Sequence, residues 1–132
     1  MNKKTDVAVV QRTPLMPAIT PDQEARLVTP AVDVYETADG YVLLIDLPGA
    51  AKDGIALWTD RDTLAVKAAV ESPHPPGARL LLGEIGNPVY YRAFTLGAGV
   101  DRTSIDARYE QGVLAVKLQK REDQKPRSIT IH

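Results

Sequence analysis

Large apolar residues recur with a period of two through much of the central part of this 132-residue chain. The runs that show this alternation are residues 41–47, 64–70, 105–110 and 113–118. Turn-forming residues separate them at Asp39-Gly40, Pro48-Gly49, Asp60-Arg61-Asp62 and Gln111-Gly112. A period of two is typical of half-buried strands, because every second side chain lies on the same face of a sheet. Short strands spaced by about 10–12 residues predict an all-β fold, an antiparallel immunoglobulin-like β-sandwich.

The two ends of the chain lack this pattern. Four prolines interrupt the first thirty residues, and the tail is charged until its last few positions. We therefore expect a flexible N-terminal arm over residues 1–29, a packed domain over 30–119 and a flexible C-terminal extension over 120–132. Within the arm, Thr20-Pro21-Asp22-Gln23 offers an N-cap, a proline at the first helical position and a capping-box glutamine, which predicts one short helix over 21–27.

A long connection, ESPHPPGARLLLGEIGNP over residues 71–88, interrupts the strand pattern. A connection of this length without regular structure is unusual in a compact domain and is often functional. It contains three consecutive leucines at positions 80–82, whose exposure to water is unfavourable. We expect that this stretch either folds back on its own core or adds to another chain.

Composition narrows the possible partners and cofactors. The chain has 16 basic and 17 acidic residues, and this balance gives no indication of nucleic acid or an anionic membrane as the main partner. The absence of cysteine excludes disulfides, thiolate nucleophiles and Cys-ligated zinc, and the two histidines are too few for a multi-His metal site. We expect no cofactor. The apolar run near the N-terminus, residues 7–10, is shorter than a signal peptide core of about 7–15 residues or a spanning helix of about 20. We therefore expect a soluble, cytoplasmic protein without integral membrane contact.

Catalytic motifs are equally scarce. The segment Gly97-Ala98-Gly99 is too short for a dinucleotide fingerprint, and the sequence has no P-loop pattern. Ser72 and Ser104 lack the context of a nucleophile elbow, and His74 lies between prolines, where we expect an exposed loop residue and not a general base. Nothing selects a carboxylate pair for a hydrolase. The sequence predicts that the protein is not an enzyme.

Three segments together carry a resemblance to a known family. They are Ala107-Arg108-Tyr109-Glu110-Gln111-Gly112-Val113-Leu114, Asp46-Leu47-Pro48-Gly49-Ala50-Ala51-Lys52-Asp53-Gly54-Ile55 and Ile129-Thr130-Ile131. In their order and spacing they resemble the small heat-shock proteins, also called the α-crystallin or Hsp20 family, in the bacterial or plant-like branch. The resemblance covers residues 31–131, and Val32-Asp33-Val34-Tyr35-Glu36 matches the opening strand of the family's domain. In the hairpin signature Ala107, Gly112, Val113 and Leu114 match, whereas Gln111 replaces the usual Asn.

The resemblance implies an ATP-independent holdase that binds partly unfolded client proteins and prevents their aggregation. It also implies a dimer that assembles into higher oligomers. An alternative from the residues alone is a β-sandwich co-chaperone or scaffold module that docks a single protein partner and does not oligomerise. The apolar tail and the long loop distinguish the two interpretations, because a simple docking module needs neither of them.

The resemblance assigns roles to several side chains. In an extended tail Ile129 and Ile131 project to the same side. The residues near which the resemblance places their groove on a neighbouring subunit are Ile55, Leu57, Ile105, Ala107 and Tyr109. It further implies that the loop strand Leu80, Leu81 and Leu82 is exchanged into a partner's sheet, beside the strand that contains residues 32–34.

For Arg92 and for the N-terminal arm, two interpretations of their role remain open. Arg92 is either a cation at the dimer interface or core edge, paired with an acid such as Glu84, or an exposed strand residue. We expect Trp58 and Phe94 to pack and not to contact clients. The arm lacks phenylalanine, and it serves either as a disordered tether or as a client contact. The side chains proposed for such a contact are Val9, Val10, Leu15, Met16 and Ile19.

Overall fold

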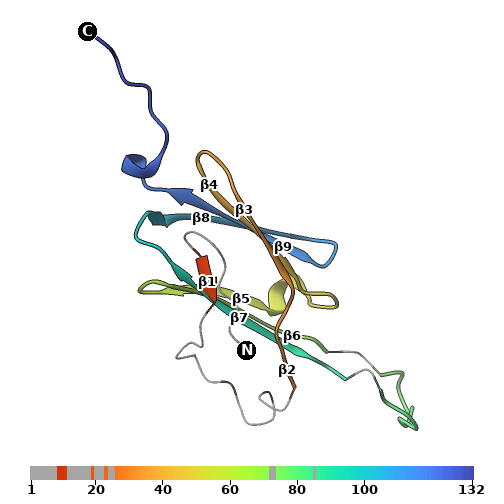
Figure 1. The fold of residues 1–132 in the computed structure, drawn as a ribbon. Helices are drawn as coiled ribbons and strands as arrows, with labels where there is room; N and C mark the ends of the chain where they lie inside the picture. Colours follow the sequence, from red (N-terminus) through yellow and green to blue (C-terminus); the bar gives the residue numbers. More distant parts are fainter. Residues whose placement is uncertain (1–8, 12–18, 20–22, 24–25, 72–73, 85) are drawn as a thin grey trace.

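In a computed structural model the chain forms two β-sheets packed face to face (Figure 1). The structure describes residues 9–11, 19, 23, 26–71, 74–84 and 86–132. The strands are β1 (Val9–Gln11), β2 (Leu27–Val28), β3 (Val32–Glu36), β4 (Gly40–Asp46), β5 (Ile55–Asp60), β6 (Thr63–Ala69), β7 (Val89–Leu96), β8 (Val100–Glu110) and β9 (Val113–Lys120). Two short 3-10 helices, η1 (Lys52–Gly54) and η2 (Glu122–Gln124), lie before β5 and after β9.

The strands pair as the alternation predicts. One sheet, called sheet B, has the strand order β3-β4-β9-β8, and the other, sheet A, has the order β1-β7-β6-β5. All pairings are antiparallel except that of β2, which runs parallel to the beginning of β7. The predicted all-β antiparallel sandwich is therefore confirmed, with β2 as the exception.

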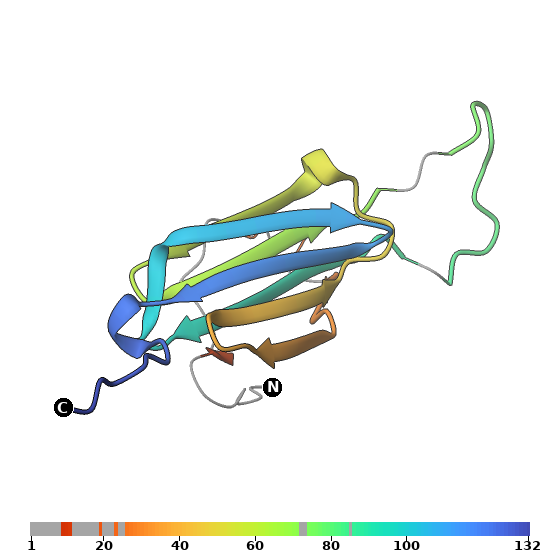
Figure 2. The same cartoon turned by 90° about the horizontal axis from the view of Figure 1, so that it is seen from above.

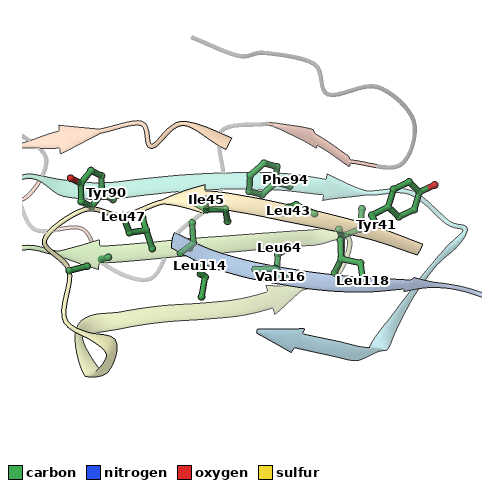
Figure 3. Packing of buried hydrophobic residues seen from close by; sticks show 14 of the residues in the cluster. Tyr41, Leu43, Ile45, Leu47, Leu64, Tyr90, Phe94, Leu114, Val116 and Leu118 are labelled. Atoms are coloured by element: carbon green, nitrogen blue, oxygen red, sulfur yellow. The ribbon is translucent and has the colours of Figure 1, made fainter. Parts of the chain in front are cut away.

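The core lies between the sheets and consists of every second side chain of the central strands. Sheet B contributes Tyr41, Leu43, Ile45, Leu114, Val116 and Leu118, and sheet A contributes Leu64, Val66, Ala68, Tyr90, Phe94 and Leu96 (Figure 3). Because strands alternate sides at each residue, the period seen in the sequence becomes the inner face of each sheet.

The long loop and the C-terminal tail leave the sandwich at opposite ends (Figures 1 and 2). The loop leaves where β6 ends and β7 begins, and the tail leaves beside the start of β8, where the backbone N–H of Arg121 donates to the carbonyl of Gly99 over 2.8 Å. The short helix expected over residues 21–27 lies largely outside the described residues, and Leu27, at its expected end, belongs to β2.

Candidate functional site

One side of the sandwich is open, and a groove with apolar and polar lining residues runs along it. The strands β5 and β8 are the edge strands of sheets A and B on this side. A hollow of about 310 Å³ lies between them, lined by Leu57, Trp58, Thr59, Leu64, Arg102, Ile105 and Ala107. Because neither edge is covered by a further described strand, core-facing side chains of both sheets reach solvent here.

Three of the five residues predicted for a tail-receiving groove line this hollow, namely Leu57, Ile105 and Ala107. The other two, Ile55 and Tyr109, are half-buried against the core beside it. The Tyr109 hydroxyl donates a hydrogen bond shared between the carbonyl oxygens of Leu47 and Ala50, at 2.9 and 2.8 Å. The structure therefore brings the predicted groove residues of β5 and β8 together along one seam.

Sequence reasoning did not find the polar end of this groove. The register of β8 against β9 shifts between Asp101 and Ile105, and this irregularity breaks the alternation of the strand. Arg102 therefore lines the hollow, and its Nη2 donates to the carbonyl of Leu96 over 3.1 Å. At the same place the hydroxyl and backbone N–H of Thr103 donate to the carboxylate of Asp101 and lower its pKa.

The predicted tail motif lies away from this groove. Beyond η2 the chain is extended, and Ile129 and Ile131 are 79% and 92% exposed. Figures 1 and 2 show the tail projecting from the domain. The two isoleucines thus have apolar surface without a partner among the described residues, and they do not fill the groove of their own chain.

The predicted loop strand is also exposed. Leu80, Leu81 and Leu82 have no strand structure, and at least 70% of each remains in solvent. Figure 2 shows the loop extending beyond the sandwich. The structure therefore does not show the first of the two alternatives, in which this stretch folds back on its own core.

Arg92 is buried on the opposite side of the sandwich, near the start of β3. Its Nη1 donates to the carbonyl of Pro30 over 2.9 Å, and its guanidinium carbon lies 5.4 Å from the centre of the Phe94 ring. Burial lowers the pKa of Arg92. Glu84 is exposed in the loop and makes no ion pair with Arg92 within the described part of the chain. The interpretation of Arg92 as an exposed strand residue is therefore wrong. Its pairing with an acid stays a prediction.

The hairpin signature forms the turn between β8 and β9. Gln111 and Gly112 have positive φ angles of 50° and 80°, and the backbone N–H of Leu47 donates to the Gly112 carbonyl over 2.7 Å. Val113 and Leu114 follow at the start of β9, opposite Glu110 and Tyr109. The signature thus positions Tyr109 at the end of the groove.

The residues proposed as client contacts are only partly described. Val9 and Val10 belong to β1, which pairs with the end of β7, and Ile19 is half-buried. Leu15 and Met16 lie outside the described residues. Phe94 is a core residue, as expected, whereas Trp58 is half-buried and lines the groove.

The described residues hold no group of three His, Asp or Glu side chains close enough for a metal ion. Across the same residues no helix has the length and apolar character needed to span a bilayer.

Comparison with known proteins decides the family. The model of the Hsp20/alpha crystallin family matches residues 33–132, which include both edge strands of the groove, the loop and the tail. The chain belongs to the Hsp20/alpha crystallin family. Membership points to a chaperone role in the stress response.

Individual relatives agree with this assignment. The chain is 31% identical over 102 residues to a probable 15 kDa heat shock protein of Leptospira interrogans, covering 77% of this chain and 78% of the relative. A small heat-shock protein from Xylella fastidiosa, whose crystal structure revealed a distinct high order structure, superposes with a TM-score of 0.64 at 27% identity, over 80% of this chain and 97% of that one. Heat shock protein 16.0 from Schizosaccharomyces pombe gives a TM-score of 0.61 at 26% identity, over 80% and 76%.

Proposed function

We propose that this chain is an ATP-independent holdase, which binds partly unfolded proteins in the cytoplasm and prevents their aggregation. The observation that carries the proposal is an open groove lined in part by Leu57, Ile105 and Ala107, on a chain whose own tail exposes two isoleucines at the spacing of one strand face. Such surfaces favour association between copies of the chain. Family membership supports the chaperone role.

The tail supports assembly through strand addition. Ile129 and Ile131 of one subunit enter the groove between β5 and β8 of another, where Leu57, Ile105 and Ala107 receive them. Burial of each isoleucine contributes about 1.5–3 kcal/mol, and ordering the tail offsets much of this. A single docked tail is therefore weak and exchangeable, whereas many tails in one assembly hold it together by multivalency.

The loop supports dimer formation. The outer edge of β3 pairs with no further strand among the described residues, and Leu80–Leu82 supply an exposed apolar segment that fits such an edge. The exchanged loop also carries Glu84 toward Arg92 of the neighbouring subunit. An acid at that position stabilises a buried cation whose Nη1 donates to the Pro30 carbonyl of its own chain.

The experiment heats a model client with the protein in the absence of ATP and follows light scattering. We expect suppression of scattering at subunit ratios near one to one, and undiminished aggregation contradicts the holdase. The same samples test assembly. Ile129→Ala with Ile131→Ala is expected to reduce the assembly to dimers by light-scattering mass. The matched control, Ser128→Ala with Thr130→Ala, changes the other face of the same tail and is expected to keep the wild-type mass. An unchanged mass in the isoleucine variant contradicts tail docking.

A further inference from the structure

The groove between β5 and β8 has one charged end. Of the described residues that line the hollow, Arg102 alone carries a charge. Its Nη2 donates to the carbonyl of Leu96, whereas its Nε is buried and has no hydrogen-bond partner among the described residues. Arg102 also forms no ion pair with the acidic residues that the structure describes. No described carboxylate therefore neutralises this guanidinium, and a second cation beside it is unfavourable.

The acidic side chains near the charged end already have partners. The arginine at this end also lines a second hollow of about 640 Å³, at the base of the tail, together with Asp101, Glu122 and Asp123. Asp123 lies 3.5 Å from Nε of Arg121, and Glu122 accepts from Nζ of Lys125 over 2.9 Å. Asp101 accepts the two hydrogen bonds described above. The base of the tail thus adjoins the charged end without cancelling its charge.

The connection of the tail to β9 determines the direction in which the tail can enter the groove of its own chain. β9 ends opposite the start of β8, where Lys120 is paired with Val100. The tail therefore begins at the charged end, and a tail entering from there places Arg127 first. In an extended chain Arg127 projects to the same side as Ile129 and Ile131, because alternate residues share a face. Docking in its own groove brings two guanidinium groups together.

The opposite direction is out of reach for a tail in its own groove, because it requires Arg127 at the Tyr109 end. From Arg121 back to the level of Tyr109, β9 covers about 23 Å at about 3.3 Å per residue. The segment from Arg121 to Arg127 begins with η2 and spans only about 16 Å, because a 3-10 helix rises about 2 Å per residue. The tail of a second copy is free of this restriction and can place Arg127 at the Tyr109 end.

We propose that Arg102 distinguishes the two tails. Repulsion between Arg102 and Arg127 keeps the tail out of the groove of its own chain and leaves this groove to the tail of a second copy, which enters antiparallel to β8. An interface selects its partner in this way when the wrong partner meets a repulsive contact. The exposure of Ile129 and Ile131 agrees with it. The inference rests on the tail docking of the proposed function and names the residue that determines its specificity.

The first test reverses the charge on the tail, where Arg127 is exposed. Arg127→Glu in the full chain replaces the repulsion by an ion pair with Arg102. We therefore expect the tail to enter its own groove and the light-scattering mass of the assembly to fall at least twofold. Thr130→Glu, which adds an acid to the other face of the tail, is the matched control and is expected to keep the wild-type mass. A mass of Arg127→Glu equal to or above that of wild type overturns the inference.

The second test restores the repulsion with the opposite sign. In Arg102→Glu with Arg127→Glu two carboxylates meet at the charged end, and we expect at least four-fifths of the wild-type mass to return. A double variant that unfolds at the wild-type urea midpoint but stays as small as Arg127→Glu overturns the inference. Should the double variant not fold, the cross-link below decides.

A cross-link detects docking within one chain directly. The chain contains no cysteine, so Thr59→Cys with Ser128→Cys creates two thiols and no others. Thr59 lines the hollow with Arg102, and a short bis-maleimide reagent joins it to residue 128 only when that part of the tail lies at the charged end. We expect at least fivefold more linked peptide from the monomer band in the Arg127→Glu background than with Arg127. Equal linkage in the two backgrounds overturns the inference.

The failure of tail docking differs from the failure of this inference. If Ile129→Ala with Ile131→Ala keeps the wild-type mass, docking between subunits fails, and the cross-link alone decides whether Arg102 excludes the tail of its own chain. If the isoleucine variant lowers the mass and Arg127→Glu does not, the proposed docking stands and the inference is overturned.

Discussion

The two sheets pack on one core, but their outer faces differ. In sheet B the burial follows strict alternation along β4, where Tyr41, Leu43 and Ile45 are buried and Val42 and Leu44 are half-exposed. In sheet A, 5 of the 7 residues of β6 and 6 of the 8 residues of β7 are buried, including the outward-facing Ala65 and Ala93. The outward side chains of β4 are therefore half-exposed, whereas Ala65 and Ala93 on the outward face of sheet A are buried.

This difference follows from the residues at the outward positions. In β4 and β9 these positions carry medium-sized or charged side chains such as Val42 and Lys117, which tolerate solvent. In β6 and β7 several are alanine, and a small side chain lets another segment approach the backbone of the sheet closely. Small outward residues therefore distinguish β6 and β7 from β4, whose outward Val42 and Leu44 are larger and half-exposed.

The largest effect is expected when a charge is placed on each outer face. Ala65→Glu puts a carboxylate into a fully buried position of sheet A, and we expect it to lower the free energy of unfolding by about 3 kcal/mol or more. Ala115→Glu, at a half-buried outward position of β9, is expected to cost less than about 1 kcal/mol. Urea unfolding at equal protein concentration measures both, and equal losses contradict the difference between the sheets.

A smaller difference is expected between two strand arginines. Arg92→Ala leaves the buried carbonyl of Pro30 without its donor and opens a cavity, so we expect a loss of about 2–3 kcal/mol. Arg108 on β8 has a side chain that is 80% exposed and lies 4.0 Å from Asp106. Arg108→Ala is therefore expected to change stability by less than about 0.5 kcal/mol. Thermal unfolding of the two variants checks this, and a loss at Arg108 equal to that at Arg92 contradicts it.

The pH dependence of stability provides a third comparison. Burial raises the pKa of the Tyr91 hydroxyl, so the native state keeps its proton at a pH where the unfolded chain has begun to lose it. The stabilisation is complete below the ordinary tyrosine pKa of about 10 and is lost as pH rises through the higher native value. After allowance for solvent screening, Tyr91→Phe is expected to lose about 1 kcal/mol less stability than wild type between pH 9 and 11.

The control for this measurement lies on sheet B. Tyr35→Phe removes a tyrosine hydroxyl at a position that is 53% exposed. Urea unfolding at pH 9 and at pH 11 measures how much free energy of unfolding each variant loses between these two values. If Tyr91→Phe loses as much free energy of unfolding between pH 9 and 11 as wild type does, the Tyr91 hydroxyl is accessible to water in the native state.

The strands of sheet B could be predicted from the sequence because only one of their faces is buried. The burial of β4 and the first half of β9 alternates, although the outward residues Val42, Leu44 and Ala115 are also apolar. In β7 apolar residues occupy both faces, so alternation alone does not identify its core side. Residues 89–96 are therefore not among the runs whose period of two predicts strands.

The groove could be predicted in part. Leu57 and Ile105 lie in different sheets, and one sequence contains no signal that their two edge strands border the same seam; the resemblance provided that pairing. Arg102 was missed because the irregularity of β8 between Asp101 and Ile105 reverses the side on which alternation places it. The docking of the tail and the exchange of the loop involve other subunits and stay predictions.

The smallest expected effect concerns the hairpin turns, where the two sheets should not differ. Arg61 follows β5 in sheet A and Gln111 follows β8 in sheet B, with φ angles of 55° and 50°. Both are left-handed conformations, which are energetically unfavourable for a residue with a Cβ. Among the non-glycine residues, asparagine tolerates them best. This cost depends on the local backbone and not on what covers the sheet.

We therefore expect Arg61→Asn and Gln111→Asn each to raise the free energy of unfolding by about 0.5 kcal/mol. Arg61→Ala and Gln111→Ala are the controls, because they shorten the side chain without easing the backbone, and we expect no gain from them. Urea midpoints with unchanged slopes measure the four variants. A gain at Gln111 without one at Arg61 means that the sheets differ in their turns as well as in their outer faces, because contacts beyond the local backbone then stabilise the turn of sheet A.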